Sequence, residues 1–487
     1  MDAVAAAQAP PNKARLEQPL LLTALVVVLG MAMTGLDMTA VNVSLDRLSS
    51  DFAAPLATVQ WVATAYTLAL AAVIPVTAWA IARFGTRRVY MVSVALFLSG
   101  SVLCGTAWSI ESLIAFRVLQ GLGGGMIMPV GMTIMTRRAG DRVPQVMAVA
   151  ALPMQLAPMI GPLVGGWLVD AVSWRWIFFL NLPVAVAALV LAARVLGADE
   201  PEPARPLDVL GLLLLSPGLS ALIFGLTTGA HHGDFGSTSA SVPTAVGAVL
   251  VAAFVAHALR AAHPLIDLRL LRRRTVAASA STLVLFMCGL FGMMLLAPLY
   301  FQTVRGESAM ATGLLLVPSG AGTMLTMPLA ARLIVRVGPR PLLLTGLALS
   351  IAGTSAFALL VGDGAAYWAL GAALFVTGGG MGMTMMPTMS SAMQTLRPEE
   401  IPVASTLLNI IQQVGASAGT ALISLVLANA LAGRASGDEP AAFQVGYAVG
   451  IAILAAALVP ATLVARHFTP RSASAPTTAP DPASAVA

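Results

Sequence analysis

The sequence predicts an all-α membrane protein with fourteen transmembrane helices. Charged residues make up only 10% of the 487 residues, whereas 58% are hydrophobic. The apolar residues fall into fourteen runs, each long enough for a bilayer core that needs about 20 apolar residues per helix. Because lipid offers backbone groups no hydrogen-bond partners, each run is expected to form a helix. The third observation is the distribution of basic residues between alternate loops.

The fourteen spans are expected at residues 20–44, 58–80, 88–107, 112–136, 144–169, 174–196, 208–229, 242–260, 275–300, 310–334, 341–361, 365–390, 403–431 and 442–466. Each run is longer than the roughly 10–14 residues of a buried helix in a soluble protein. Five tryptophans at span ends predict an interfacial aromatic belt, namely Trp61, Trp108, Trp174, Trp176 and Trp368.

Basic residues set the predicted orientation. With a cytoplasmic N-terminus, the inner segments hold 21 of the 26 Lys and Arg residues, so both termini are expected in the cytoplasm. The net charge of +5 therefore reflects membrane topology, and no nucleic-acid partner is expected. A single lysine among many arginines, with abundant alanine, suggests a bacterial source and hence the bacterial inner membrane. Cys104 and Cys288 lie inside spans, so no structural disulfide is expected.

An internal repeat divides the chain. Pro75, Arg83, Gly85 and Arg87 after the second span recur 253 residues later as Pro328, Arg336, Gly338 and Arg340. A second set recurs at an offset of 258: Gly121/Gly379, Gly124/Gly382, Met128/Met386, Pro129/Pro387, Met135/Met393, Gln155/Gln413 and Gly161/Gly419. The pattern predicts one six-span unit used twice in the same orientation, with a substrate site near the membrane midplane between the halves.

The domain boundaries follow from this repeat. Residues 19–197 are expected to form an N-terminal six-helix bundle and residues 275–467 a C-terminal one. Residues 198–274 form a linker that contains two inserted spans, the seventh and eighth. The ends, 1–18 and 468–487, are rich in Pro, Ala, Ser or Thr and are expected to be disordered cytoplasmic tails.

Ionisable groups inside spans are costly and functional by default. Asp37 in the first span and Arg117 in the fourth lie at similar depth in the outer half of the membrane. Burial favours a neutral carboxyl and a nearby cation favours an ionised one, so a carboxyl between these influences can gain and lose a proton. The alternatives are a structural Asp37 that hydrogen-bonds a neighbouring helix, and a structural Arg117 that pairs with helix carbonyls.

Three further patterns concern conformational change and substrate binding. Gly161, Pro162, Gly165 and Gly166 in the fifth span suit a helix that packs tightly and bends, as a gate or as ordinary packing. The loop arginines can bond carbonyls at helix ends and so act as a cytoplasmic latch. Methionine strings at 126–135 and 381–393 suit either a pocket for varied apolar molecules or methionines that face lipid or fill a core.

Other chemistries lack their sequence patterns. The sequence has no phosphate-binding Gly-x-x-x-x-Gly-Lys loop, which argues against an ATP-driven pump within this chain. No metal-ligand spacing occurs among the five histidines, and no soluble stretch is long enough for an enzyme domain. We therefore expect neither a cofactor, a metal nor an enzymatic activity. A membrane sensor or scaffold without transport is disfavoured because both Asp37 and the repeat are present.

In order along the chain, several motifs resemble the fourteen-span drug:proton antiporter family of the major facilitator superfamily. They are Leu36-Asp37-Met-Thr39 with Asn42, Trp61 with Tyr66, Arg117 with Gln120, Gly121 and Gly124, Gly161-Pro162 with Gly165-Gly166, Ser173-Trp174-Arg175-Trp176-Ile-Phe178 with Asn181 and Pro183, and Gln302, Gly306, Ser308, Gly313 and Pro318. One departure concerns the loop between spans 2 and 3, where Ala82 stands in place of the usual acid and Val335 is its repeat counterpart.

The resemblance implies alternating-access export of amphipathic, in part cationic, small molecules in exchange for protons, by a monomer. The alternative is a dedicated exporter of one metabolite, antibiotic, siderophore or lipid. We expect Asp37 and Arg117 to handle the proton. Expected substrate contacts are Asp37, Asn42, Tyr66, Gln120, Met128, Gln155, Met386, Asn409 and Gln413. Expected gating and packing residues are Gly161, Pro162, Gly165, Gly166, Arg83, Gly85, Arg87, Arg336, Gly338 and Arg340.

Overall fold

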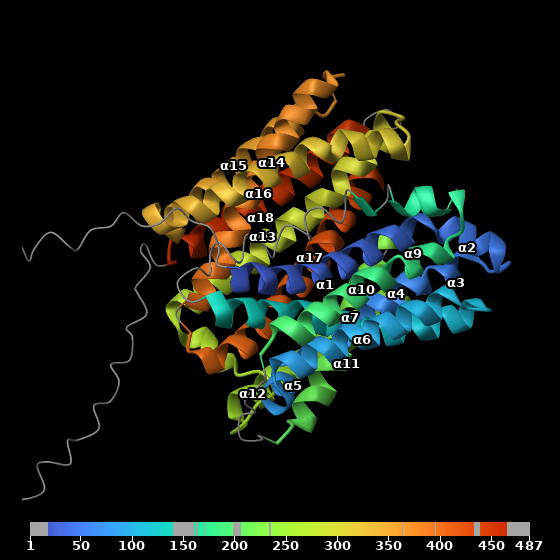
Figure 1. Cartoon of the computed structure of the whole chain (residues 1–487). Helices are drawn as coiled ribbons and strands as arrows, with labels where there is room; N and C mark the ends of the chain where they lie inside the picture. Colours follow the sequence, from blue (N-terminus) through green and yellow to red (C-terminus); the bar gives the residue numbers. More distant parts are fainter. Residues whose placement is uncertain are drawn as a thin grey trace, which may run out of the picture.

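The computed structural model describes residues 18–139, 160–161, 164–169, 171–197, 206–232, 235–362, 364–394, 396–432 and 439–464. Within these ranges all regular secondary structure is helical, as predicted (Figure 1). Thirteen of the described helical segments are long and apolar enough to cross a membrane. Most of the predicted span at 144–169 lies outside the described residues, so the count of fourteen and the orientation stay predictions.

The helices before the linker, called here the N-terminal helices, include two short helices between the first and second spans that the sequence did not predict. Their bounds are α1 Gln18–Val43, α2 Leu45–Asp51, α3 Leu56–Val59, α4 Trp61–Val73, η1 Ile74–Val76, α5 Thr77–Phe84, α6 Thr86–Gly105, α7 Ile110–Ala139, α9 Arg175–Phe179 and α10 Asn181–Val195. The second span is divided into α4, η1 and α5 because Pro75 in η1 lacks an N–H group.

The linker holds α11 Val209–His232, α12 Thr238–Arg260 and η3 Leu268–Arg272. The C-terminal helices are α13 Arg274–Leu299, η4 Tyr300–Val304, α14 Ala309–Val337, α15 Pro339–Leu360, α16 Tyr367–Gln394, η5 Pro398–Glu400, α17 Ile401–Ala432 and α18 Glu439–Ala461. In Figure 1, α13–α16 and α18 lie on one side of the molecule and α4, α6, α7 and α10 on the other, with α1 and α17 between them.

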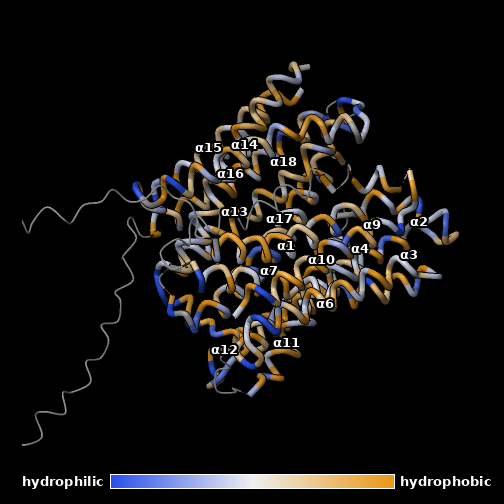
Figure 2. Tube along the Cα trace, in the orientation of Figure 1, coloured by the Kyte–Doolittle hydropathy of each residue, from blue (hydrophilic) through white to orange (hydrophobic). Residues whose placement is uncertain are grey.

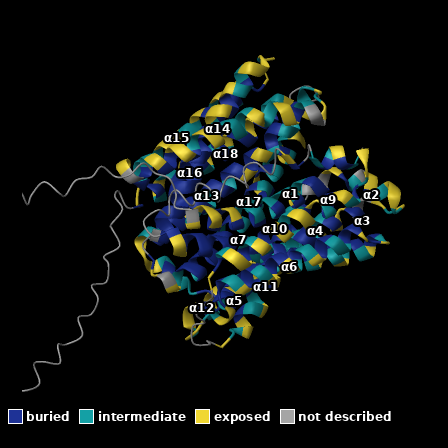
Figure 3. Ribbon diagram, viewed as in Figure 1, coloured by how far each residue is buried: buried dark blue, intermediate teal, exposed yellow. Residues whose placement is uncertain are grey.

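Apolar residues run along the whole length of the long helices, and hydrophilic residues gather at their ends (Figure 2). Buried residues face the interior and exposed ones the outside (Figure 3). Many exposed side chains are large and apolar, for example Leu213, Val249, Leu325 and Val459. Exposing such an apolar surface to water is unfavourable, whereas contact with the lipid chains of a membrane is not.

The two halves of the predicted repeat share local geometry. Gly85 and Gly338, 253 residues apart, both have φ of 86°, which a glycine adopts without steric cost. In each turn the glycine N–H donates to the carbonyl four residues earlier, Ile81 at 2.8 Å and Ile334 at 2.9 Å. The structure therefore repeats the same helix–turn–helix connection in both halves.

The inserted helix α11 contacts both groups of helices. Ser220 on α11 donates to the Leu68 carbonyl of α4 at 3.3 Å, and Ser424 of α17 donates to the Ala230 carbonyl of α11 at 2.5 Å. An apolar cluster continues this junction toward the predicted cytoplasmic face. Its buried members are Ile74, Leu215, Leu219, Phe254, Ala258, Leu265, Ile266, Leu407 and Ile410.

Asp208 fixes the start of α11 to α12 and to the following loop. Its carboxylate accepts from the Gly211 amide at 2.8 Å and the Leu265 amide at 3.0 Å, and it lies 2.9 Å from His257 Nε2. Burial by itself raises the pKa of Asp208, but these hydrogen bonds outweigh it and hold the pKa below its ordinary value. Nearby, Arg273 donates to both carboxylate oxygens of Glu400, at 2.6 and 3.0 Å.

The predicted aromatic belt is wrong for one of its five tryptophans. Trp61, Trp108, Trp176 and Trp368 are exposed at helix ends, but Trp174 is only 1% exposed. Its indole nitrogen donates to Asp51 at the end of α2, at 3.0 Å, and its ring packs against Phe52 and Phe178. The unpredicted helix α2 thus supplies a partner that buries a tryptophan otherwise suited to the membrane interface.

Candidate functional site

A buried polar cluster lies among α1, α6, α7 and α10, and Asp37 and Arg117 lie about two turns inside the ends of α1 and α7. Asp37 comes from α1, and Arg117 and Gln120 lie one turn apart on α7, so both side chains face α1. Asn181 begins α10 and Ser101 lies on α6. All five side chains belong to residues that are 3% exposed or less, in a surrounding of apolar residues.

The Asp37 carboxylate accepts three hydrogen bonds. Arg117 Nη1 donates to Oδ2 at 2.5 Å, while Gln120 Nε2 and Asn181 Nδ2 donate to Oδ1 at 2.8 and 3.1 Å. Arg117 also donates to the Gln120 side-chain oxygen at 2.9 Å and, through Nε, to the Val62 carbonyl at 3.0 Å. The pair is therefore a buried salt bridge whose two members make further hydrogen bonds, which is the form in which charges tolerate burial.

The orientation of Gln120 follows from its neighbours. A guanidinium can only donate, so the Gln120 oxygen must face Arg117 and its NH₂ group must face Asp37. The Arg117 guanidinium also lies 4.1 Å from the ring centre of Tyr66, a distance at which cation–π attraction is favourable. The Tyr66 hydroxyl is buried and has no hydrogen-bond partner.

An apolar cluster lies between these polar groups and the outer ends of the helices. It includes Leu48, Val62, Cys104, Trp174 and Phe178, each 2% exposed or less. In this conformation Asp37 and Arg117 are each 1% exposed, so water does not reach the carboxylate. A proton can exchange with Asp37 only after the surrounding helices move.

The structure brings Asp37, Arg117, Tyr66 and Gln120 together, and in the part of the chain that it describes the expected contacts Met128, Met386, Asn409 and Gln413 make no hydrogen bond to this cluster. Asn409 donates to the Ser405 carbonyl of its own helix α17 at 2.8 Å. Met128 on α7 and Gln413 on α17 are half-buried. The side chain of Asn42 and all of Gln155 lie outside the described residues.

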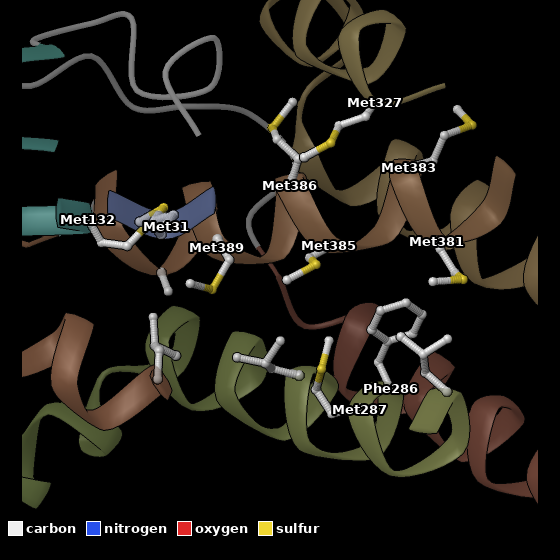
Figure 4. Close-up of a cluster of buried hydrophobic side chains, with 14 of the residues drawn as sticks. Met31, Met132, Phe286, Met287, Met327, Met381, Met383, Met385, Met386 and Met389 are labelled. Carbon is white, nitrogen blue, oxygen red and sulfur yellow. The ribbon is translucent and has the colours of Figure 1, made fainter. Parts of the chain in front are cut away.

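Most of the methionine string on α16 packs within the C-terminal helices (Figure 4). Met381, Met385 and Met389 point toward Phe286 and Met287 of α13, and Met386 and Met383 lie on the side of α14, where Met386 is near Met327. All of these methionines are 8% exposed or less. Met31 of α1 and Met132 of α7 belong to the same cluster of buried hydrophobic residues as Met389, so this cluster includes methionines of both halves (Figure 4).

The expected packing residues occupy defined positions. Cβ atoms added at Gly161 and Gly165 would overlap Thr39 and Ala40 of α1, so the fifth span packs closely against the segment that follows Asp37. A Cβ at Gly166 would make an ordinary van der Waals contact with Val43, at 3.8 Å, and Pro162 lies outside the described residues. A gating role for these residues stays a prediction.

One loop arginine makes the expected bond to a helix end. Arg87 donates to the Ala193 carbonyl in the last turn of α10 at 2.8 Å. This contact joins two N-terminal helices and does not cross to the C-terminal ones. Arg83 and Arg336 are exposed, and Arg340 is half-buried.

Sequence reasoning did not assign Asn181 and Ser101 to the site. Both are neutral, so their burial carries no strong electrostatic cost that would have drawn attention to them. The sequence does contain an indication for Asn181, which stands inside an apolar run without a polar neighbour, just after the Trp174 motif. A buried amide needs hydrogen-bond partners, and the structure supplies them.

The fold and the buried ion pair define a polytopic membrane protein with a charged site between its helices, the arrangement of a secondary transporter. Residues 27–420 match the model of the Major Facilitator Superfamily, and the chain belongs to this family. It is therefore a transporter and not an enzyme.

Relatives with high coverage carry related names. The chain is 47% identical over 416 residues to the "Multidrug resistance protein B homolog" of Mycobacterium tuberculosis, covering 85% of this chain and 77% of that protein. It is 29% identical to the "Multidrug export protein EmrB" of Haemophilus influenzae, covering 84% and 81%. Among solved structures, the human organic anion transporter MFSD10 matches with a TM-score of 0.63 at 15% identity, covering 93% of this chain and 100% of that one, which supports the fold alone.

Proposed function

We propose that this protein exports amphipathic small molecules, cationic ones among them, out of a bacterial cell in exchange for protons. The proposal rests on the Asp37–Arg117 pair and on relatives whose names refer to multidrug resistance and export. Substrate binds between the two halves from the cytoplasm or the inner leaflet while Asp37 is ionised. A proton from outside then neutralises Asp37, substrate leaves, and rocking of the halves resets the carrier.

The buried carboxylate is the single observation that carries this proposal. In the part of the chain that the structure describes, no second acid is buried inside a membrane span. We therefore propose about one proton per transport cycle. For a neutral substrate, the single charge that crosses 100 mV releases about 2.3 kcal/mol, enough to drive export against a concentration gradient of roughly 50-fold; for a monovalent cation the exchange moves no net charge and only the pH gradient drives it. No cofactor is required, and the protein works as a monomer in the inner membrane with both termini in the cytoplasm.

The test is pH-gradient-driven efflux from proteoliposomes by Asp37→Asn beside the wild-type protein. Glu111→Gln is a matched control because Glu111 is an acid at the exposed outer start of α7, the helix that carries Arg117. We expect Asp37→Asn to abolish uphill efflux and Glu111→Gln to retain it. Undiminished uphill efflux by Asp37→Asn would overturn the mechanism. A panel of unrelated dyes and drugs distinguishes broad export from export of one compound.

A further inference from the structure

Asn181 has an unusual set of contacts for a residue at the start of a helix. Its side chain is buried, and both hydrogens of Nδ2 are used: one toward Asp37 Oδ1 at 3.1 Å and one toward Ser101 Oγ at 3.0 Å. Ser101 in turn donates to the Phe178 carbonyl at 2.9 Å. A continuous chain of hydrogen bonds therefore connects Asp37 to the backbone of α9.

The polarity of this chain is fixed by its far end. A backbone carbonyl only accepts, so the Ser101 hydroxyl must donate to Phe178 and must accept from Asn181. The nitrogen end of the Asn181 amide then faces both Ser101 and Asp37, and it presents a donor to the carboxylate. Donors stabilise the ionised form of a carboxyl group. Asn181 is thus oriented by its neighbours to support an ionised Asp37.

Protonation of Asp37 would weaken all three of these hydrogen bonds. Gln120 and Asn181 donate to Oδ1 and Arg117 donates to Oδ2, so one of the four lone-pair sites of the carboxylate, on Oδ2, is open to a proton. A proton there removes the negative charge, and hydrogen bonds to a neutral carboxyl are weaker than those to a carboxylate. The titratable groups that face Asp37 from the packed helices are Arg117, Tyr66 and Cys104.

The three donors differ in how firmly the backbone holds them. Arg117 and Gln120 lie in the first half of α7, a continuous helix of 30 residues. Asn181 lies in the turn before Pro183 in the sixth span, and Leu180 between α9 and α10 has helical backbone angles, so the helix continues from α9 into α10. Pro183 has no N–H, so it gives no helical hydrogen bond to the Phe179 carbonyl. The turn that carries Asn181 is therefore the one that moves most easily.

We propose that Asn181 is a positioning residue that transmits the charge state of Asp37 to the sixth span. While Asp37 is ionised, Asn181 holds the start of α10 against α1 and α6. When Asp37 takes a proton, the Asn181 contact is the one released, and α10 becomes free to move at the turn before Pro183, where the Phe179 carbonyl lacks a helical hydrogen bond. This inference rests on the proposed proton exchange at Asp37.

The first test measures protonation of Asp37 without transport. A hydrophobic carbodiimide modifies protonated buried carboxyls, so labelling of the full-length protein is followed against pH, with Asp37→Asn as the blank. We expect Asn181→Ala to move the labelling midpoint up by about one pH unit, because one donor to the charged form is lost. Ser101→Ala should move it in the same direction by less, since the amide loses the partner that orients it.

Ser99→Ala is the matched control, because Ser99 lies on the same helix α6 as Ser101 and bonds only to the carbonyl of Ala95 in the described contacts. It should leave the midpoint unchanged. A purely structural Asn181 would lower protein yield and thermal stability in the Ala variant with no change in the midpoint, and that result overturns the proposal. If Asn181→Ala does not fold, an unchanged midpoint in Ser101→Ala overturns it equally.

The second test measures movement of α10 by hydrogen–deuterium exchange of peptides around residues 181–190. In Asp37→Asn, exchange at neutral pH should rise to the level that the wild-type protein shows at low pH. In Asn181→Ala, exchange should stand at this raised level at neutral pH and at low pH alike. Equal exchange in all proteins would refute the proposed release. Loss of efflux in Asp37→Asn together with an unchanged Asn181→Ala midpoint would leave the proton mechanism standing and remove only the role of Asn181.

Discussion

Replacing Arg117 with methionine tests the buried ion pair directly. Methionine has a similar length but no charge, so the substitution leaves the Asp37 carboxylate buried without its cation. The substitution also removes the hydrogen bonds that Arg117 donates to Val62 and Gln120, and its contact with the Tyr66 ring. Removing one partner of a buried pair costs about 3–5 kcal/mol, because the remaining charge stays uncompensated.

The double variant Asp37→Asn/Arg117→Met removes both charges and should be less destabilised than the sum of the two single variants. We expect a coupling energy of at least about 2 kcal/mol from this cycle. The free energy of unfolding is measured in mixed detergent micelles by titration with SDS. The defect of Arg117→Met should be smaller at ~pH 5 than at neutral pH, because acid favours the neutral form of a carboxyl that is buried without its cation.

Arg175→Met is a suitable control, because Arg175 also lies over an aromatic ring, at 4.4 Å from Trp174, but is outside the buried cluster. Its defect should not depend on pH between neutral and ~pH 5. If the effects of the Asp37 and Arg117 substitutions simply add in the double variant, the two charges do not stabilise each other and the reasoning is wrong.

Three further outcomes follow from the packing and the linker. Gly419→Ala would place a Cβ on the carbonyl oxygen of a residue in α13 and should lower the melting temperature clearly. Gly313 has open space around it, so Gly313→Ala should leave the melting temperature unchanged. Equal melting temperatures of the two variants would contradict this. Asp208→Asn should lower the stability of the folded protein at neutral pH. The stability difference from the wild-type protein should vanish as pH falls through the pKa of Asp208, which lies below the ordinary 3.8, because the contacts of Asp208 stabilise only its ionised form. A difference in thermal unfolding that stays constant across pH would refute this. Glu400→Gln should cost at most about 1 kcal/mol, since its pair with Arg273 is partly exposed, and a larger loss in SDS unfolding would show a stronger bond.

The sequence allowed prediction of the spans and of the repeat because both depend on composition and spacing. Charge is so rare inside the spans that Asp37 and Arg117 stood out, and their similar depth indicated that they could meet. The structure places them in contact, with Gln120 one helical turn from Arg117. Such pairs are visible in a sequence because burying a charge without a partner is prohibitive.

Neutral partners and short helices were harder to predict. Asn181 and Ser101 contribute to the site through geometry between α6 and α10, and this depends on how the helices pack. Trp174 was assigned to the interface because tryptophan prefers that depth, but Asp51 on α2 provides its indole with a buried partner. Hydropathy does not predict α2, because a seven-residue helix outside the membrane has no apolar run of its own.

The position of α11 has a consequence for entry from the bilayer. This helix lies against both α4 and α17, with hydroxyl–carbonyl bonds to each and an apolar cluster toward the predicted cytoplasmic end. On that side of the molecule, α11 therefore lies between the lipid and the junction of the two halves. An apolar molecule dissolved in the bilayer on that side would meet α11 before it reached α4 or α17.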